Sequence, residues 1–148
     1  MDKILFSTGN TEWGTPPALF ERLHRKYCFD YDPASNHDNH LTRMYSTLDG
    51  TFYSWGRDPV SNSDGLDFNW DGRHIFLNPP YGRGIGSWMR KAVESDCLVV
   101  ALVPVRTGSK WWQEWVIPYS DIEFLPGRLK FVGAKNSAPF DSAIVRYR

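Results

Sequence analysis

The 148 residues are enough for one domain around a single core, so we expect one domain over residues 1–148 without a separate target-recognition domain. A hydrophobic content of 41% excludes a disordered chain, and the absence of any run of roughly 18 apolar residues excludes a helical membrane span. The net charge of zero excludes a uniformly basic protein, yet residues 1–82 hold 7 basic and 11 acidic residues while residues 83–148 hold 10 and 6.

Neither a secreted protein nor a metal site is indicated by the sequence. Met1 is followed within three residues by a run of only three apolar residues, too short for a signal-peptide core, so we expect a cytoplasmic protein. Cys28 and Cys97 are isolated, and the four histidines show no metal-ligand spacing. We therefore predict no disulfide and no bound metal.

The first predicted elements are a helix and a short strand. Thr15 can cap a helix that Pro16 opens, and apolar residues at four-residue intervals predict an amphipathic helix over about 16–27. Residues 29–32 alternate apolar and polar and are followed by Pro33, which predicts a strand with Asp32 at its carboxyl end.

The middle of the chain combines an irregular stretch with a buried strand. Residues 46–73 are rich in Gly, Asp, Ser and Asn, which is typical of loops, and long loops in compact domains are often functional. Residues 74–77 predict a buried strand that runs directly into Asn78-Pro79-Pro80-Tyr81, and a helix is expected around 86–95.

The C-terminal half continues the alternation of strands with helices. The apolar run 98–103 is typical of a central parallel strand, and Ser109 can cap a helix that holds three tryptophans. Residues 122–125 predict a further strand, and residues 128–132 and 142–147 predict a closing antiparallel pair. The pattern predicts an α/β fold whose mostly parallel sheet binds its ligand beyond the carboxyl ends of its strands.

The Asn-Pro-Pro-Tyr stretch carries the chemistry, and we predict Asn78, Pro79, Pro80 and Tyr81 as catalytic residues. The Asn78 side-chain oxygen and the Pro79 carbonyl can accept the two N–H groups of a planar amine and so direct its nitrogen toward a methyl donor. Two prolines in succession fix the backbone that presents these acceptors. The Tyr81 ring can stack on a planar base, which contributes roughly 1–3 kcal/mol.

This tetrapeptide by itself indicates methylation of an amine on a planar group. An adenine amine in DNA, a base in RNA and the side-chain amide of a protein glutamine all pose the same chemical problem. A cofactor-binding or nucleic-acid-binding module without catalysis is a further alternative.

Segments along nearly the whole chain resemble the phage-type DNA N6-adenine methyltransferases, the Dam family. They are Trp13-Gly14-Thr15-Pro16, 29–35, 64–66, 78–82, 102–107, 127–131 and 136–140. The resemblance implies a reduced Rossmann-like fold that binds S-adenosylmethionine, with transfer of its methyl group to the N6 amine of adenine in site-specific or relaxed-specificity fashion. For a phage-encoded enzyme, the compartment would be the host cytoplasm.

The resemblance also implies where the cofactor lies. Trp13, Thr15 and Pro16 match the segment that holds the methionine end, and the helix start near Thr15 suits its carboxylate. Asp32 and Ala34 match the element near the cofactor's amino group and sugar, with Asn36 and Asn78 as further candidates. The glycine-rich loop common in methyltransferases is missing.

DNA is the expected partner, and a homodimer is a possible assembly. A base inside a duplex must be extruded before its amine can react. Basic residues in the C-terminal half lie next to Gly or Pro or near a helix start, where they can reach phosphates that flank the extruded base. The predicted DNA contacts are Arg83, Arg106, Lys110, Arg128 and Lys130.

Overall fold

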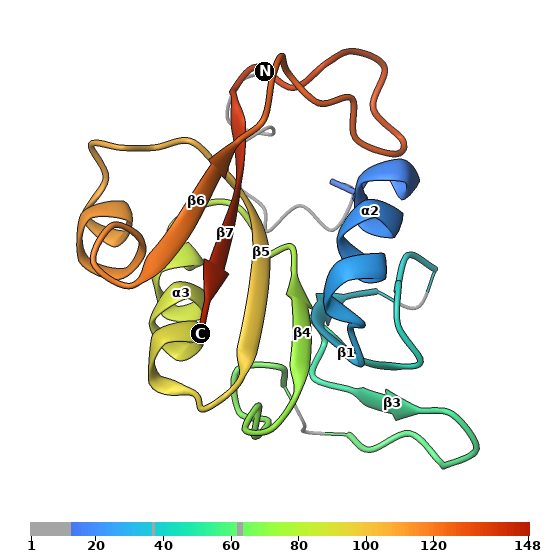
Figure 1. The fold of residues 1–148 in the computed structure, drawn as a ribbon. Helices are drawn as coiled ribbons and strands as arrows, with labels where there is room; N and C mark the ends of the chain where they lie inside the picture. Colours follow the sequence, from blue (N-terminus) through green and yellow to red (C-terminus); the bar gives the residue numbers. More distant parts are fainter. Residues whose placement is uncertain (1–12, 37, 62–63) are drawn as a thin grey trace.

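A mixed sheet organises the computed structural model, which describes residues 13–36, 38–61 and 64–148 (Figure 1). The described strands follow the order β3-β2-β1-β4-β5-β7-β6. They are Tyr31–Ser35 (β1), Met44–Thr47 (β2), Phe52–Ser54 (β3), His74–Leu77 (β4), Leu98–Pro104 (β5), Ser120–Phe124 (β6) and Ser142–Tyr147 (β7). Strands β2, β1, β4 and β5 pair in parallel, and β3, β7 and β6 run antiparallel to their neighbours. The predicted α/β fold with a parallel core and a C-terminal antiparallel pair is confirmed.

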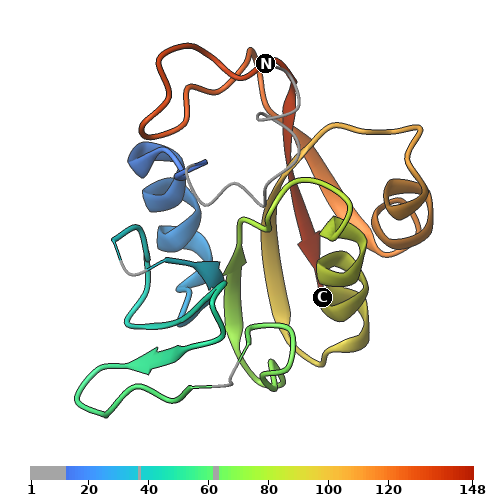
Figure 2. The same cartoon turned by 180° about the vertical axis from the view of Figure 1, so that it is seen from behind.

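Helices cover opposite faces of this sheet, as Figures 1 and 2 show together. Phe20 of helix α2 (Pro17–Tyr27) packs edge-on against Phe76 of β4, with ring centroids 5.2 Å apart. Met89 of helix α3 (Ile85–Glu94) lies beside Tyr147 of β7, whose hydroxyl is 3.6 Å from its sulfur. The π-helical turn η1 (Trp112–Val116) packs next to α3 and buries Trp112.

The predicted helix over 16–27 is confirmed, but its predicted cap is wrong. Pro16 precedes the first helical residue, and its carbonyl accepts the amide hydrogens of Leu19 and Phe20 at 3.1 Å. The Thr15 hydroxyl does not cap the helix, because it faces Asn78 instead. The helix ends at Cys28, which adopts a left-handed conformation.

Strand β1 begins two residues later than predicted and continues through Pro33. Proline has no backbone N–H to donate to a neighbouring strand. It fits within β1 because the β1–β2 register shifts between Asp32 and Ser35, where the ladder does not need that donor. Gly65 lies directly against this strand, since a Cβ at its position would stand 2.0 Å from the Pro33 carbonyl oxygen. Asp32 is therefore buried within β1 rather than placed at its end.

Strands β4 and β5 form the buried centre of the sheet. Strand β4 covers the predicted residues, and β5 extends the predicted run by Pro104. Residues 99–104 of β5 are all buried, which explains the apolar run without alternation. The four parallel strands bring their carboxyl ends to one edge, at the top of Figure 1.

Three expectations for the remaining segments need correction. Residues 128–132 do not form a strand, and Val132 makes only an isolated bridge to Gly14. Strand β7 pairs antiparallel with both β5 and β6 instead. The predicted strand at 122–125, found at Ser120–Phe124, is therefore one of its two partners. The Ser109 hydroxyl donates back to the Arg106 carbonyl and caps no helix.

The predicted irregular segment 46–73 begins within β2, which pairs with β3 as an antiparallel hairpin. None of the helices among the described residues has the length and hydropathy of a membrane span. The N-terminal residues used to predict a cytoplasmic protein lie outside the described part of the chain.

Candidate active site

A pocket opens at the carboxyl edge of β1 and β4, and the predicted cofactor residues line it. Its cavity has a volume of about 30 Å³ and lies within about 400 Å³ of empty space that includes open solvent. Six of the seven predicted residues line this pocket: Trp13, Thr15, Asp32, Ala34, Asn36 and Asn78. Pro16 does not, because its carbonyl begins helix α2.

The Asn78 side chain is held in one orientation by the segment before α2. Its amide nitrogen donates to the Trp13 carbonyl at 2.7 Å and to the Thr15 hydroxyl at 3.1 Å. A carbonyl oxygen can only accept, so the NH₂ group must face Trp13 and the side-chain oxygen must point elsewhere. This oxygen is buried and accepts no hydrogen bond from the residues that the structure describes.

An unpaired buried acceptor costs about 1–3 kcal/mol, and such groups are rare in folded proteins. The Asn78 oxygen is therefore a buried acceptor, fixed in place in the pocket wall, that a ligand can use. Trp13 contributes a second unpaired group, because its indole N–H is buried without a partner among the described residues.

Asp32 is the only acidic side chain among the residues that line the pocket in the described structure. Burial raises the pKa of its carboxyl group to about 7. Hydrogen bonds from the backbone amides of Leu41 and Ala34 lower this pKa, but their effect is smaller than that of burial. The Leu41 amide lies 3.4 Å from the carboxylate, a long hydrogen bond. The carboxyl group therefore retains acceptor capacity for a donor on a ligand.

Asn36 shapes the pocket wall through a turn. Its side-chain oxygen accepts the amide hydrogens of Asp38 at 3.0 Å and Asn39 at 2.8 Å. These bonds hold the chain after β1 against the pocket, where Asn39 and Leu41 also line it.

An aromatic cluster flanks the pocket next to the Asn-Pro-Pro-Tyr stretch. The Trp13 ring packs against Phe131 and Phe140, with centroids 5.0 and 5.6 Å away, and Tyr81 contacts the same two rings. Tyr81 is 5% exposed and its hydroxyl donates to the Leu102 carbonyl at 3.2 Å. In this arrangement the Tyr81 ring faces the aromatic cluster and is not accessible to a base. Stacking of an extruded base on Tyr81 stays a prediction, and it requires a rearrangement that exposes the ring.

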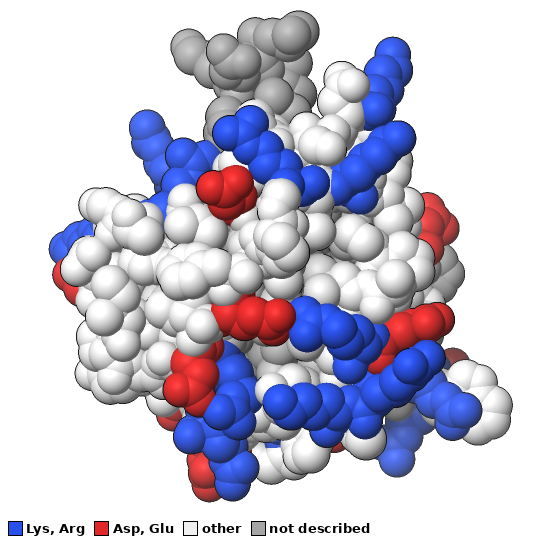
Figure 3. All heavy atoms as spheres, turned by 45° about the horizontal axis from the view of Figure 1, so that its top comes forward, with Lys and Arg blue, Asp and Glu red and all other residues white. Residues whose placement is uncertain are grey.

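The predicted DNA contacts are all exposed and come from separate segments. Arg83 follows β4, Arg106 and Lys110 follow β5, and Arg128 and Lys130 belong to the loop before β7. Lys110 pairs with Glu114 and Arg128 with Asp141, each at 3.7 Å, and both pairs are exposed and therefore weak. Figure 3 turns the carboxyl edge of the sheet toward the viewer. Basic side chains lie along the upper part of this view, where acidic side chains are fewer than in the lower part.

The loop that carries Arg128 and Lys130 is tied to the pocket. Val132 donates its amide hydrogen to the Gly14 carbonyl at 2.9 Å, directly between Trp13 and Thr15. Leu129 accepts the Ala138 amide hydrogen at 2.7 Å, which folds the loop back on itself. The basic side chains are thus connected through backbone contacts to the segment that orients Asn78.

The sequence did not reveal several residues of the pocket wall. Ser35, Asn39, Leu41, Leu48, Phe76 and Gly14 line the pocket but were not among the predicted site residues. Leu41 and Leu48 lie in loops with no periodic pattern, so nothing in the sequence distinguished them. Asn39 lies in a polar stretch whose composition predicts a loop but not a pocket.

The parallel core and the Asn-Pro-Pro-Tyr stretch at the end of β4, beside a pocket with a fixed acceptor, are features of the amine methyltransferase class. The chain belongs to the DNA N-6-adenine-methyltransferase (Dam) family, whose family model matches residues 6–145. The comparison with individual curated proteins finds no match. The protein is therefore an enzyme that methylates the N6 amine of adenine in DNA, which selects one of the activities that the tetrapeptide left open.

Proposed function

We propose that S-adenosylmethionine is the methyl donor and that it binds in the pocket between Trp13 and Leu41. The observation that carries this proposal is the convergence of six predicted cofactor residues on one pocket whose wall holds unpaired polar groups. The Asp32 carboxylate suits a ligand that offers hydrogen-bond donors or a positive charge, as the amino group and sugar of the cofactor do. The half-buried Ala34 leaves room in the pocket next to it.

The orientation of Asn78 supports its role in catalysis. When bound, S-adenosylmethionine supplies an activated methyl group. The Asn78 oxygen accepts one N–H of the adenine amine, and the Pro79 carbonyl accepts the other. Together they aim the nitrogen lone pair at the methyl donor. Because the methylated amine is acidic, its proton passes to water and the site needs no strong base.

The basic residues at the carboxyl edge support binding of the DNA backbone. These residues follow the carboxyl ends of β4 and β5 or belong to the loop before β7, and they neutralise phosphates on either side of an extruded adenine: Arg83, Arg106, Lys110, Arg128 and Lys130. Their contribution is expected to fall with rising salt concentration, since counterion release drives such contacts.

The cofactor assignment is tested by filling the pocket. Ala34→Leu places a larger side chain in the pocket and should abolish binding of S-adenosylmethionine in calorimetry. Ala18→Leu makes the same change at an exposed position of α2 and should leave binding unchanged. Equal affinity in the two variants would place the cofactor elsewhere.

The reaction is tested with isotope-labelled S-adenosylmethionine and DNA, RNA or protein as acceptor. We expect label in N6-methyladenine of DNA, identified by mass spectrometry of the digested product. Label that appears only in RNA or protein would contradict the assigned substrate.

A further inference from the structure

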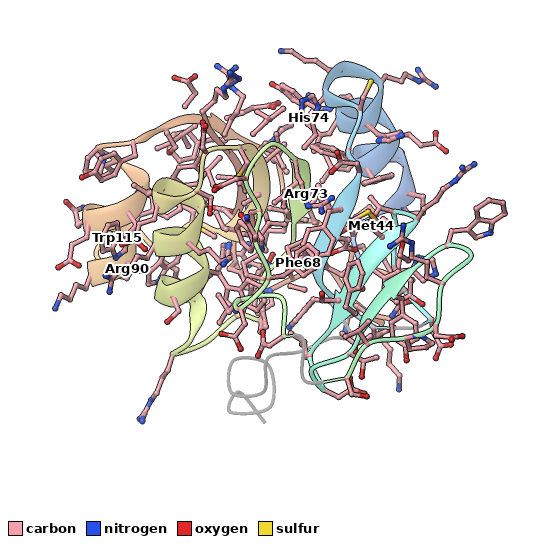
Figure 4. All side chains as sticks on the ribbon, turned by 90° about the horizontal axis from the view of Figure 1, so that it is seen from below. Met44, Phe68, Arg73, His74, Arg90 and Trp115 are labelled. Atoms are coloured by element: carbon pink, nitrogen blue, oxygen red, sulfur yellow. The ribbon has the colours of Figure 1, made fainter. Side chains whose placement is uncertain are left out.

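The β2–β3 hairpin at the edge of the sheet has two different faces, because side chains alternate along each strand. On one face, Phe52 stacks on Phe68 with centroids 4.6 Å apart, and Tyr31 contacts both rings. The Arg73 guanidinium lies 5.1 Å from the Phe68 ring centre, and Figure 4 shows Arg73 and Phe68 close to Met44 in the view from below. This face is closed by its own side chains.

The opposite face of the hairpin is open and aromatic. Tyr45 of β2 stacks on Tyr53 of β3 at 4.9 Å and 13°, and His40 stacks on Tyr45 at 3.8 Å and 6°. A trough with about 760 Å³ of space, open to solvent, follows this face. We call it the aromatic trough, and its lining residues are His40, Leu41, Thr42, Arg43, Tyr45, Tyr53, Ser54 and Trp55.

Trp55 ends the aromatic trough and is 82% exposed, more than any other large hydrophobic residue of the described structure. The Arg43 guanidinium lies 5.7 Å from the centre of its ring and makes no ion pair with the residues that the structure describes. Arg57 follows closely in the chain, and Asp58 beside it offsets its charge. An exposed indole with an adjacent unpaired cation is typical of a binding surface.

The trough and the active-site pocket share one wall residue. Leu41 lines both, and its amide is the one that reaches Asp32. Asn39 lines the pocket and the next residue, His40, lines the trough. The trough extends from this wall to Trp55, so a strand bound along it reaches the pocket at Leu41.

We propose that the aromatic trough binds the DNA strand that flanks the target adenine, with a base stacked on Trp55 and a phosphate held by Arg43. Flat rings beside a cation are the features that bind single-stranded nucleic acid without reading its sequence. The inference rests on the proposed function, because the strand is held relative to a base in the Asn78 pocket. It gives the enzyme a DNA contact beyond its basic residues.

The test compares Trp55→Ala with the wild type on two single-stranded oligonucleotides, one of about 20 nucleotides and one of about five, each with one central adenine. On the long substrate KM should rise about tenfold or more, while kcat at saturation stays unchanged. On the short substrate, which cannot reach the trough, the two proteins should behave alike. Trp55→Phe retains an aromatic ring and should restore most of the difference.

Phe124→Ala is the matched control, because Phe124 is an exposed aromatic residue, 61% exposed, on the opposite edge strand β6. It should leave KM unchanged on both substrates. An unchanged KM of Trp55→Ala on the long oligonucleotide would overturn the inference, as would equal changes on both substrates. A trough that serves a second copy of the chain would show as a change in molar mass in light scattering without a change in KM.

Binding of S-adenosylmethionine separates this failure from failure of the proposed function. If the wild type binds the cofactor and methylates the short oligonucleotide while Trp55→Ala is indifferent, only the trough is wrongly assigned. If the wild type does neither, the proposed cofactor pocket is wrong.

Discussion

The active-site pocket and the aromatic trough lie side by side but are built on different principles. The pocket holds buried polar groups, and the Asn78 oxygen and the Trp13 N–H lack partners among the described residues. The trough consists of stacked rings, with His40 exposed over the buried Tyr45, and it opens to solvent. Catalysis requires a few groups in fixed orientation, whereas binding of a strand requires area and tolerates different bases. The following predictions test whether this division holds.

The largest effect is expected for Asn78→Ala. Loss of the oriented acceptor should lower kcat by about 100-fold to 1000-fold, the usual effect of removing one positioned hydrogen-bonding group. Affinity for S-adenosylmethionine, measured by calorimetry, should change much less. Asn69→Ala, at an exposed position outside the pocket, serves as the control. Equal loss of binding and turnover would make Asn78 mainly a cofactor ligand.

Rigidity of the pocket is tested at Gly65, which packs against β1. Gly65→Ala places a Cβ against the Pro33 carbonyl and should lower the free energy of unfolding by about 3 kcal/mol in urea denaturation. Gly108→Ala has open space around its Cβ and should be nearly neutral. An unchanged free energy of unfolding for Gly65→Ala would show that β1, which carries Asp32, shifts easily to make room for the added Cβ.

Asp32 should make cofactor binding depend on pH. With a pKa raised to about 7 in the free protein, the carboxyl group must ionise before it accepts donors from the cofactor. Affinity for S-adenosylmethionine should therefore increase about tenfold per pH unit below pH 7 and level off above it. Asp32→Asn should remove this slope. A wild-type affinity that stays constant between about pH 5.5 and about pH 8 would contradict the prediction.

The same raised pKa has the opposite sign for stability. The folded protein holds the Asp32 proton more tightly than the unfolded chain, so stability without cofactor should fall as pH rises from about 4 to about 7. Thermal unfolding should show Asp32→Asn as more stable than the wild type at pH 8 but not near pH 4. No difference at either pH would show that solvent already screens this carboxylate.

The smallest effect is expected for Tyr81→Phe. Removal of the hydroxyl leaves the Leu102 carbonyl without this donor and should cost about 1 kcal/mol of stability. Turnover should stay near that of the wild type if the ring alone contacts the base, whereas Tyr81→Ala should lose it. An equal loss of turnover in both variants would assign a catalytic role to the hydroxyl.

The sequence by itself determined the elements whose patterns are local. Strand β4, helix α2 and the buried run of β5 follow from periodicity and from proline positions. The Asn-Pro-Pro-Tyr stretch predicts its chemistry without a structure, because the required acceptors and the rigid backbone are adjacent in the chain. The resemblance then indicated adenine in DNA, and the family match confirmed it.

Tertiary structure decided what depends on contacts between distant residues. The Thr15 hydroxyl could cap its helix or meet Asn78, and only the packing of the two segments selects the second. Residues 128–132 have a strand-like pattern, but β6 already pairs with the free edge of β7. This segment therefore packs against Trp13 through Phe131 instead. The pocket wall at Leu41 and the exposure of Trp55 follow from how loops and the hairpin pack. Burial and orientation are properties of the folded chain, and a local pattern does not contain them.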